Sequence, residues 1–362
     1  MRLTKLSFMS WLMAIFLVAS FVVIPIPAVG AEKASPYAVQ CIADQEAVGE
    51  EGVINYHILY HQVENKNNTH SWIKVKVPKG LDISKDDLQG GSWDEKSRMI
   101  KWQVVNHENK NNNVIHFNLK VKKGVQKGTV HELGCVLESN GTVIEETPVV
   151  KVKVGTQIDQ PFFTGFPDGH FYPSEHLTRA EAAAIISRVK NLNDGKAVMH
   201  YSDVKKDHWG FEYIHQVTQA GYMKGFSDGT FRPGEAISKA EVVTILLRLR
   251  GVQELPYGKG HWAKENMDTA KALKWIKEIG DLNELDYPIE RADAAKIFDI
   301  AFYRGPLEDG ETKVKQHFPD VPRSHWAFHW IEEASKEAHE AVYRKKGVEE
   351  LIRYLPYLTE PF

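Results

Sequence analysis

One unit of sequence recurs through the C-terminal half of the chain and fixes most of what that half can fold into. The unit is complete at residues 201–249, where apolar residues at helical spacing are interrupted by the stretch GFSDGTFRP at 225–233. Apolar residues every three or four positions predict one buried face on each helix, and Gly and Pro indicate the turn between the helices. We therefore expect each unit to fold as helix, loop and helix.

The second helix of each unit begins with a capping sequence. TRAE at 178–181 and SKAE at 238–241 are capping boxes, ERAD at 290–293 is a weaker copy, and a second loop, GFPDGHFYP, stands at 165–173. In a capping box the hydroxyl accepts the third amide of the helix, and the acid reaches back to the cap amide. After each box the apolar positions keep one register, which allows three equal stripes to be buried only against each other or their neighbours. This pattern predicts an all-α module with pseudo-threefold symmetry.

The order of these motifs resembles the S-layer homology (SLH) family. The resemblance covers about residues 161–338 and lies in the Phe/Tyr-x-Asp-Val…His-Trp start, the Gly-x-x-Asp-Gly-x-Phe-x-Pro loop and the Thr-Arg-Ala-Glu box. It implies non-covalent anchoring to a cell-wall polysaccharide, typically one that carries ketal-linked pyruvate. It also implies a secreted protein at the cell surface or S-layer.

The units are unequal. Residues 161–200 hold only the back half of a first unit, 201–256 a complete second unit, 257–304 a third with a degraded loop, and 318–362 open a fourth front helix. Because the first unit lacks a front and the last a good back, we expect the helix at about 326–338 to pack beside residues 178–190 and close the ring. Burial of its apolar stripe, at ~25 cal/mol per Å², favours closure. The alternative is that 318–362 form a degenerate fourth repeat.

Residues 36–154 show the two-residue alternation of half-buried strands, for example at 115–121, and Asn140-Gly141 indicates a hairpin turn. Seven or eight short strands predict an antiparallel β-sandwich, and the segment loosely resembles the Ig-like repeats of bacterial surface proteins. Such a domain is expected to be a spacer or stalk, with specific binding of a protein partner as the alternative. Residues 155–161 are interpreted as a linker.

Residues 1–31 have a basic start, an apolar run and small residues before Ala31, which is typical of a secretory signal peptide cleaved after Ala31. An uncleaved anchor is the alternative, and no later stretch is apolar enough to span a membrane. Export permits a disulfide between Cys41 and Cys135, while buried free thiols remain equally compatible with the sequence.

Cations stand at the first position of the three capped helices: Arg179, Lys239 and Arg291. A cation is mildly unfavourable at a helix N-terminus, but free amides beside a guanidinium or ammonium can hold a carboxylate. We therefore predict polysaccharide binding at these residues, with the caps Thr178 and Ser238 beside them. The competing interpretation is that each cation pairs with a neighbouring acid at the surface.

The loop acids Asp168 and Asp228 are predicted mainly to stabilise their turns, with a sugar contact as the lesser alternative. Trp209, Trp262 and Trp326 follow a histidine at the start of each front helix. We expect them to pack in the core, although an aromatic face could also stack on a sugar.

The rest of the sequence argues against several function classes. With 45 Lys and Arg against 48 Asp and Glu, the net charge of −3 gives no argument for nucleic acid. No metal-ligand, nucleophile or phosphate-loop motif stands out, so no catalytic residue, metal or cofactor is predicted. The sequence favours a wall-binding protein, with a scaffold whose sandwich binds a protein as the second hypothesis and a polysaccharide-processing enzyme as the third.

Overall fold

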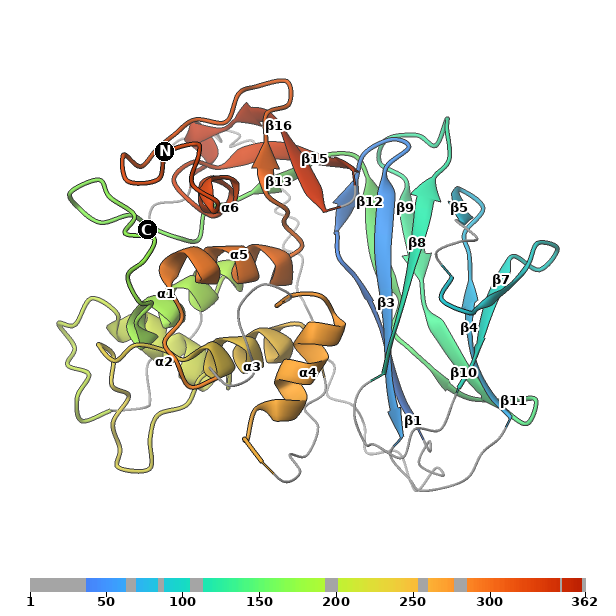
Figure 1. Cartoon of the computed structure of the whole chain (residues 1–362), viewed down its shortest axis with the longest axis horizontal. Coiled ribbons are helices and arrows are strands. Elements are labelled where there is room, and N and C mark those ends of the chain that lie inside the picture. The colour runs from blue at the N-terminus through green and yellow to red at the C-terminus, as the bar shows by residue number, and fades with distance from the viewer. Residues whose placement is uncertain are drawn as a thin grey trace, which may run out of the picture. The chain divides into compact units, whose positions relative to one another are not determined.

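The computed structural model describes residues 37–62, 70–83, 88–104, 113–192, 201–252, 260–276, 285–345 and 347–359. The predicted signal peptide, with its cleavage site at Ala31, lies outside the described residues. Antiparallel β-sheets come first along the described chain, and a part with six helices follows (Figure 1).

The N-terminal strands form two larger sheets and one small one. Their orders are β1-β3-β8-β5, β11-β10-β4-β7-β6 and β2-β12-β9, and the β2–β12 pair alone among these pairings is parallel. The bounds are β1 (Tyr37–Ala43), β2 (Ala47–Val48), β3 (Val53–Gln62), β4 (Ser71–Lys76), β5 (Leu81–Ile83), β6 (Ser92–Asp94), β7 (Met99–Gln103), β8 (Asn113–Val121), β9 (Val130–Leu133), β10 (Cys135–Ser139), β11 (Thr142–Glu146) and β12 (Val150–Val154).

The two larger sheets share one apolar core. Phe117 of β8 packs on Trp102 of β7 with ring centroids 5.2 Å apart, and it stacks on Tyr56 of β3 at 5.4 Å. The predicted hairpin joins β10 to β11 through Asn140 and Gly141, whose φ angles of 49° and 80° are those of a two-residue turn. The strands β2, β5 and β6 were not predicted, because each is only two or three residues long.

Cys41 of β1 and Cys135 of β10 are buried free thiols. Burial, together with a hydrogen bond to Cys41, raises the pKa of the Cys135 thiol well above its usual range. Of the two alternatives that the sequence left open, the structure has the buried free thiols.

The helical part repeats one pair of helices three times. The bounds are α1 (Arg179–Val189), α2 (Phe211–Gln219), α3 (Lys239–Leu249), α4 (Lys264–Ala272), α5 (Arg291–Ala301) and α6 (Phe328–Ala334). Both predicted capping boxes are complete, at Thr178 for α1 and Ser238 for α3, whereas Glu290 gives α5 no side-chain cap. Within each pair the helices pack together, as α1 with α2, α3 with α4 and α5 with α6.

The segments just before α1, α3 and α5 are joined in a closed cycle of backbone hydrogen bonds. The amide of Leu177 donates to Ile289 at 3.0 Å, Ile289 donates to Ile237 at 3.0 Å, and Ile237 donates to Leu177 at 2.9 Å. All three residues are completely buried. The three units are therefore bonded to one another at equivalent positions around a common centre.

Residues 318–335 contact the loop of the first unit through Asp320. The carboxylate of Asp320 accepts the amides of Phe171 and Tyr172 at 2.7–3.2 Å, in the way that Asp203 of the second unit accepts Phe231 and Arg232 at 2.7–2.8 Å. The C-terminal end of α6 contacts the first unit as well, because the carbonyl of Ala334 accepts the amides of Phe162 and Phe163. One detail of the prediction needs correction: the helix that α6 packs against is α5, rather than residues 178–190.

In the described residues after α6, the chain forms strands in place of the helices expected of a fourth repeat. β15 (His339–Lys345) and β16 (Val348–Tyr354) form a hairpin, and a short helix, η3 (Pro356–Leu358), follows. This hairpin lies in a sheet of order β13-β15-β16-β14, with β13 (Gln157–Asp159) and β14 (Leu307–Glu308) at its edges. The prediction of a linker at 155–161 is therefore wrong for residues 157–159, and the polar insertion after residue 304 contributes a strand.

Candidate functional site

Arg179 joins the first unit to the second. Its Nε donates to the carbonyl of Phe231 at 2.9 Å, one terminal nitrogen donates to the carbonyl of Lys224 at 2.9 Å, and the other donates to Glu241 Oε1 at 2.8 Å. Arg179 is only 4% exposed. Burial lowers the pKa of Arg179, and Glu241 opposes that shift, so the guanidinium stays a cation.

Arg291 makes the same joint between the third unit and the first. Its guanidinium donates to the carbonyls of Phe171 and Thr164, each at 2.9 Å, and to Glu181 Oε1 at 2.7 Å. At the remaining joint, the backbone amide of Lys239 donates to Tyr287 at 3.0 Å. Burial raises the pKa of Asp293, and the Lys239 charge opposes the rise, so lysine faces an acid there as well.

These contacts give Arg179 and Arg291 a structural role in addition to the predicted one. Each nitrogen of Arg179 and Arg291 already donates to a protein acceptor, so neither guanidinium presents a free fork to a ligand carboxylate. The acid that each arginine meets is the capping-box glutamate of the next unit. Their first role is to hold the units together, and what reaches a neighbouring cleft is their positive charge.

The tryptophans of the three His-Trp pairs are exposed, contrary to the expectation of core packing. The exposed fractions are 58% for Trp209, 44% for Trp262 and 55% for Trp326. The histidine before each one explains this, because its Nδ1 accepts a backbone amide two residues later at 3.0–3.1 Å and so fixes the helix start. With the histidine turned onto the backbone, the indole points outward.

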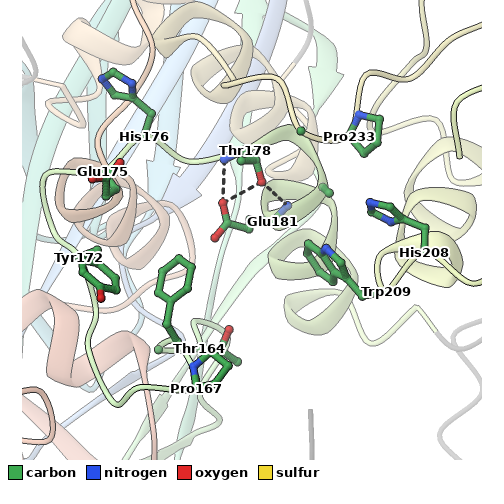
Figure 2. A pocket seen from close by; sticks show the side chains of 14 residues that line it. Thr164, Pro167, Tyr172, Glu175, His176, Thr178, Glu181, His208, Trp209 and Pro233 are labelled. Carbon is green, nitrogen blue, oxygen red and sulfur yellow. Dashed lines mark hydrogen bonds between the residues drawn. The ribbon is translucent and has the colours of Figure 1, made fainter.

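The first cleft lies between the loop of the first unit and the start of α2 (Figure 2). It has a volume of about 780 Å³. In Figure 2, Tyr172 and Glu175 stand across from Trp209, and the capping box of Thr178 and Glu181 lies between them. A smaller hollow continues from it past Arg188 to Arg291.

The second cleft, between α3 and Trp262, repeats that hollow residue by residue. Glu181, Ala184, Ile185, Arg188 and Trp209 in the first position correspond to Glu241, Thr244, Ile245, Arg248 and Trp262 in the second. The second cleft has a volume of about 230 Å³ and is the more positive of the two. Three cations line it, Arg179, Lys224 and Arg248, against the single carboxylate of Glu241.

The third position around the ring is built differently. The place of Arg188 and Arg248 is taken by Ile300, and the Lys296 ammonium lies 5.8 Å from the ring centroids of both Trp326 and Trp330. Residues 277–284, which include most of the third loop, lie outside the described part of the chain.

The loop acids close their turns as predicted. Asp168 accepts the amide of His170, and Asp228 accepts the amide of Thr230, each at 3.0 Å. Sequence reasoning missed the cleft-lining Arg188, Lys224 and Arg248. Their signal was present: Arg188 and Arg248 follow their capping boxes at the same distance, but a cation late in a helix is also ordinary for complementing the helix dipole.

Part of this helical region matches the model of a known protein family. The model for the S-layer homology domain matches residues 162–183 and 200–243, which contain the first two caps and both complete loops. The first two units of the helical part therefore belong to the S-layer homology family. In the described part of the chain, no helix has the length and apolar content needed to cross a membrane.

Curated relatives of this SLH protein belong to bacterial cell surfaces. The chain is 32% identical over 197 residues to the cellulosome-anchoring protein of Acetivibrio thermocellus. This alignment covers 49% of this chain and 43% of the relative. It is 30% identical over 169 residues to an S-layer protein of Bacillus licheniformis, covering 43% of this chain and 19% of that protein. The chain therefore spans less than half the length of these relatives, and the match assigns the protein to the outside of the cell, in association with the wall.

Among solved structures, the major pilin subunit BcpA of Bacillus cereus aligns with a TM-score of 0.27 and 14% identity. The alignment covers 34% of this chain and 41% of the pilin. A likeness at this level does not assign a fold.

Proposed function

We propose that this protein is a non-catalytic wall-binding protein that holds an acidic, pyruvylated secondary cell-wall polysaccharide in the clefts between its SLH units. The observation that carries the proposal is the second cleft, where the exposed indole of Trp262 lies beside three cations. The names of relatives, a cellulosome-anchoring protein and an S-layer protein, support an anchoring role.

The chemistry of the second cleft fits an anionic sugar. An indole offers a flat apolar face to the C–H face of a pyranose ring, and its N–H remains in contact with water. Arg248 and Lys224 supply positive charge beside that face, while Arg179 adds its charge from below. A ketal-linked pyruvate places one carboxylate on the sugar, which a charge-assisted hydrogen bond from Arg248 can hold.

The closed cycle of backbone hydrogen bonds before α1, α3 and α5 supports a proposal for the architecture of the SLH part. In this proposal the SLH part is a pseudo-threefold module in which residues 318–335 complete the first unit, as the Asp320 and Asp203 contacts suggest. The N-terminal sheets would be an Ig-like sandwich displayed as a spacer or adhesion domain. This assignment leaves both the glycan-binding chemistry and the connection to the wall to the SLH part.

Substitutions in the second cleft test the proposal without disturbing the joints. We expect Trp262→Ala and Arg248→Gln each to weaken binding to purified cell-wall polysaccharide roughly tenfold, about 1.4 kcal/mol, measured by calorimetry on the full chain. Trp326→Ala is the matched control, because that indole stands where Ile300 replaces the arginine, and we expect less than a threefold change. Equal affinity of wild type, Trp262→Ala and Arg248→Gln would remove the second cleft from the proposal.

A further inference from the structure

A cluster of ionisable side chains is sealed beneath the C-terminal hairpin. It gathers residues from five segments that are far apart in the sequence: Asp159 of β13, Asp299 of α5 with Arg304 just after it, Glu333 of α6, His339 of β15 and Glu349 of β16. Four of these residues are completely buried: Asp299, Glu333, His339 and Glu349. These segments lie together in the upper part of Figure 1.

The contacts inside the cluster compensate only part of its negative charge. Arg304 Nε lies 3.1 Å from Asp159 Oδ1, and a terminal nitrogen of Arg304 lies 3.7 Å from Glu333 Oε1. Neither carboxylate oxygen of Asp299 has a hydrogen-bond partner, and Glu349 Oε2 has none. Burial, with the charges of Glu333 and Asp159, raises the pKa of Asp299 well above its usual range, and Arg304 opposes the rise. A buried carboxylate without a partner is strongly destabilising unless a proton or a further cation compensates it.

His339 is oriented as a metal ligand. Its Nδ1 lies 3.2 Å from the backbone carbonyl of Glu337 and can donate to it, which turns Nε2 toward Glu333 Oε2 at 2.8 Å. The 2.8 Å contact requires a proton between Nε2 and the Glu333 carboxylate, and binding of a cation would release that proton and leave Nε2 as a ligand. Asp159, Glu333 and His339 each offer one ligand atom, and these atoms lie within 4.8 Å of one another. Ligand atoms around a tetrahedral zinc ion are roughly 3.3 Å apart, which fits that spacing.

We propose that Asp159, Glu333 and His339 bind one divalent cation of the class that takes both imidazole and carboxylate ligands, with Zn²⁺ as the representative ion. The four carboxylates of Asp159, Asp299, Glu333 and Glu349 outnumber the single guanidinium of Arg304, and a divalent cation would take the place of protons in the cluster. The imidazole argues against Ca²⁺, which prefers oxygen ligands throughout. Asp299 and Glu349 would lie around the ion as further acceptors. The ion would fasten the hairpin to β13 and α6, independently of any glycan.

The test uses the full chain, dialysed against a chelator and then titrated with Zn²⁺, with Ca²⁺ as the comparison. Native mass spectrometry should show one Zn²⁺ per chain, and Tm should rise by several degrees with Zn²⁺ and not with Ca²⁺. Amide hydrogen exchange should slow in β13, β15 and β16 on Zn²⁺ addition and stay unchanged in β3 and β8. A chain that binds no Zn²⁺, or whose hairpin amides exchange at the same rate with and without it, would overturn the site and leave shared protons as the compensation.

Two substitutions locate the ion. Asp159→Asn and His339→Gln should each weaken Zn²⁺ binding at least tenfold, whereas Glu350→Gln should not. Glu350 is the matched control because it neighbours Glu349 on β16 and pairs with Arg344 at 3.1 Å, away from the cluster. Undiminished binding in both variants would overturn the assignment. If neither variant folds, the exchange measurement on wild type decides the question, since it needs no substitution.

Discussion

Arg179 and Arg291 do the same work at two joints of the ring. Each guanidinium satisfies two backbone carbonyls and one capping-box glutamate of a different unit, and each is almost fully buried. The acceptors would be left without partners if the fork were lost. A buried acceptor without a donor costs more than a typical hydrogen bond contributes, so these residues matter to stability before they matter to any ligand.

Arg179→Lys should therefore destabilise the protein by about 2–4 kcal/mol, because an ammonium cannot reach three acceptors in fork geometry. Urea unfolding of the full chain measures the change. Arg232→Lys is the control: Arg232 pairs with Asp228 at 3.0 Å on the surface, and its replacement should change the free energy of unfolding much less than Arg179→Lys does. Equal losses in the two variants would contradict the role of Arg179 as a joint.

His116 of β8 is expected to make stability depend on pH. Burial, the neighbouring His57 and Lys274 lower the pKa of His116 to about 4. The unfolded chain takes up this proton below its ordinary pKa of 6.5, whereas the folded chain does not until about pH 4, so stability falls as pH falls through that window. Asp44, which contacts His57 at 2.7 Å, opposes the shift and limits its size.

The measurement compares the Tm of wild type and His116→Gln between pH 7 and pH 4. Wild type should lose stability more steeply as the pH falls, because only wild type has the His116 proton to take up on unfolding. Carboxylates that titrate in this range are common to both proteins and cancel in the comparison. Parallel curves would show that His116 is not the residue responsible.

At the residue scale, the sequence predicted what depends on near neighbours. The capping boxes and the Asx turns of Asp168 and Asp228 need only residues two or three positions away, and they form as predicted. The partners of Arg179 lie 45 to 62 residues further along the chain, and no local pattern distinguishes a joint from a ligand site. The exposure of Trp262 was missed for the same reason, because helical spacing alone did not show that His261 would accept a backbone amide and leave the indole exposed.

At the scale of elements, Asp320 and Asp203 make equivalent contacts to the loops of the first and second units. Asp320 holds the amide of Tyr172, whose φ is 57°, and Asp203 holds the amide of Arg232, whose φ is 60°. Both loop residues adopt a left-handed conformation that is unfavourable for a side chain other than Gly, so the two carboxylates stabilise the loops against strain. The same contact thus fixes a loop and attaches a front helix to it.

Asp320→Ala should lower the free energy of unfolding by about 1–3 kcal/mol, because two amides of the first loop lose a charged acceptor. Asp203→Ala is the matched variant in the second unit and should cost a similar amount, measured by urea unfolding. A much smaller effect at Asp320 than at Asp203 would mean that residues 318–335 do not complete the first unit.

Strand pairing explains what the sequence could not predict at this scale. The helices of the described chain carry their own periodicity, although the last one was expected at about 326–338 and runs only over Phe328–Ala334. β13 has only three residues, and its partner β15 begins at His339, about 180 positions later. A three-residue strand has no measurable alternation, so its segment was interpreted as a linker, and the hairpin at 339–354 was missed.

At the scale of the whole molecule, the net charge does not describe the charge of each region. The chain as a whole carries −3, whereas the second cleft gathers three cations against one acid, so any attraction to an acidic polymer must act locally. Such attraction is screened by salt, and wall binding is therefore expected to weaken as ionic strength rises.

The central claim is that the clefts between the SLH units recognise the carboxylate of a pyruvylated wall glycan. Its most direct test measures binding of the full chain to purified cell walls before and after mild acid removes the pyruvate ketals. We expect at least a tenfold loss of affinity on treated walls for wild type, and little further loss on those walls for Arg248→Gln, whose missing guanidinium has no carboxylate left to meet. Equal binding of wild type to treated and untreated walls would contradict the claim.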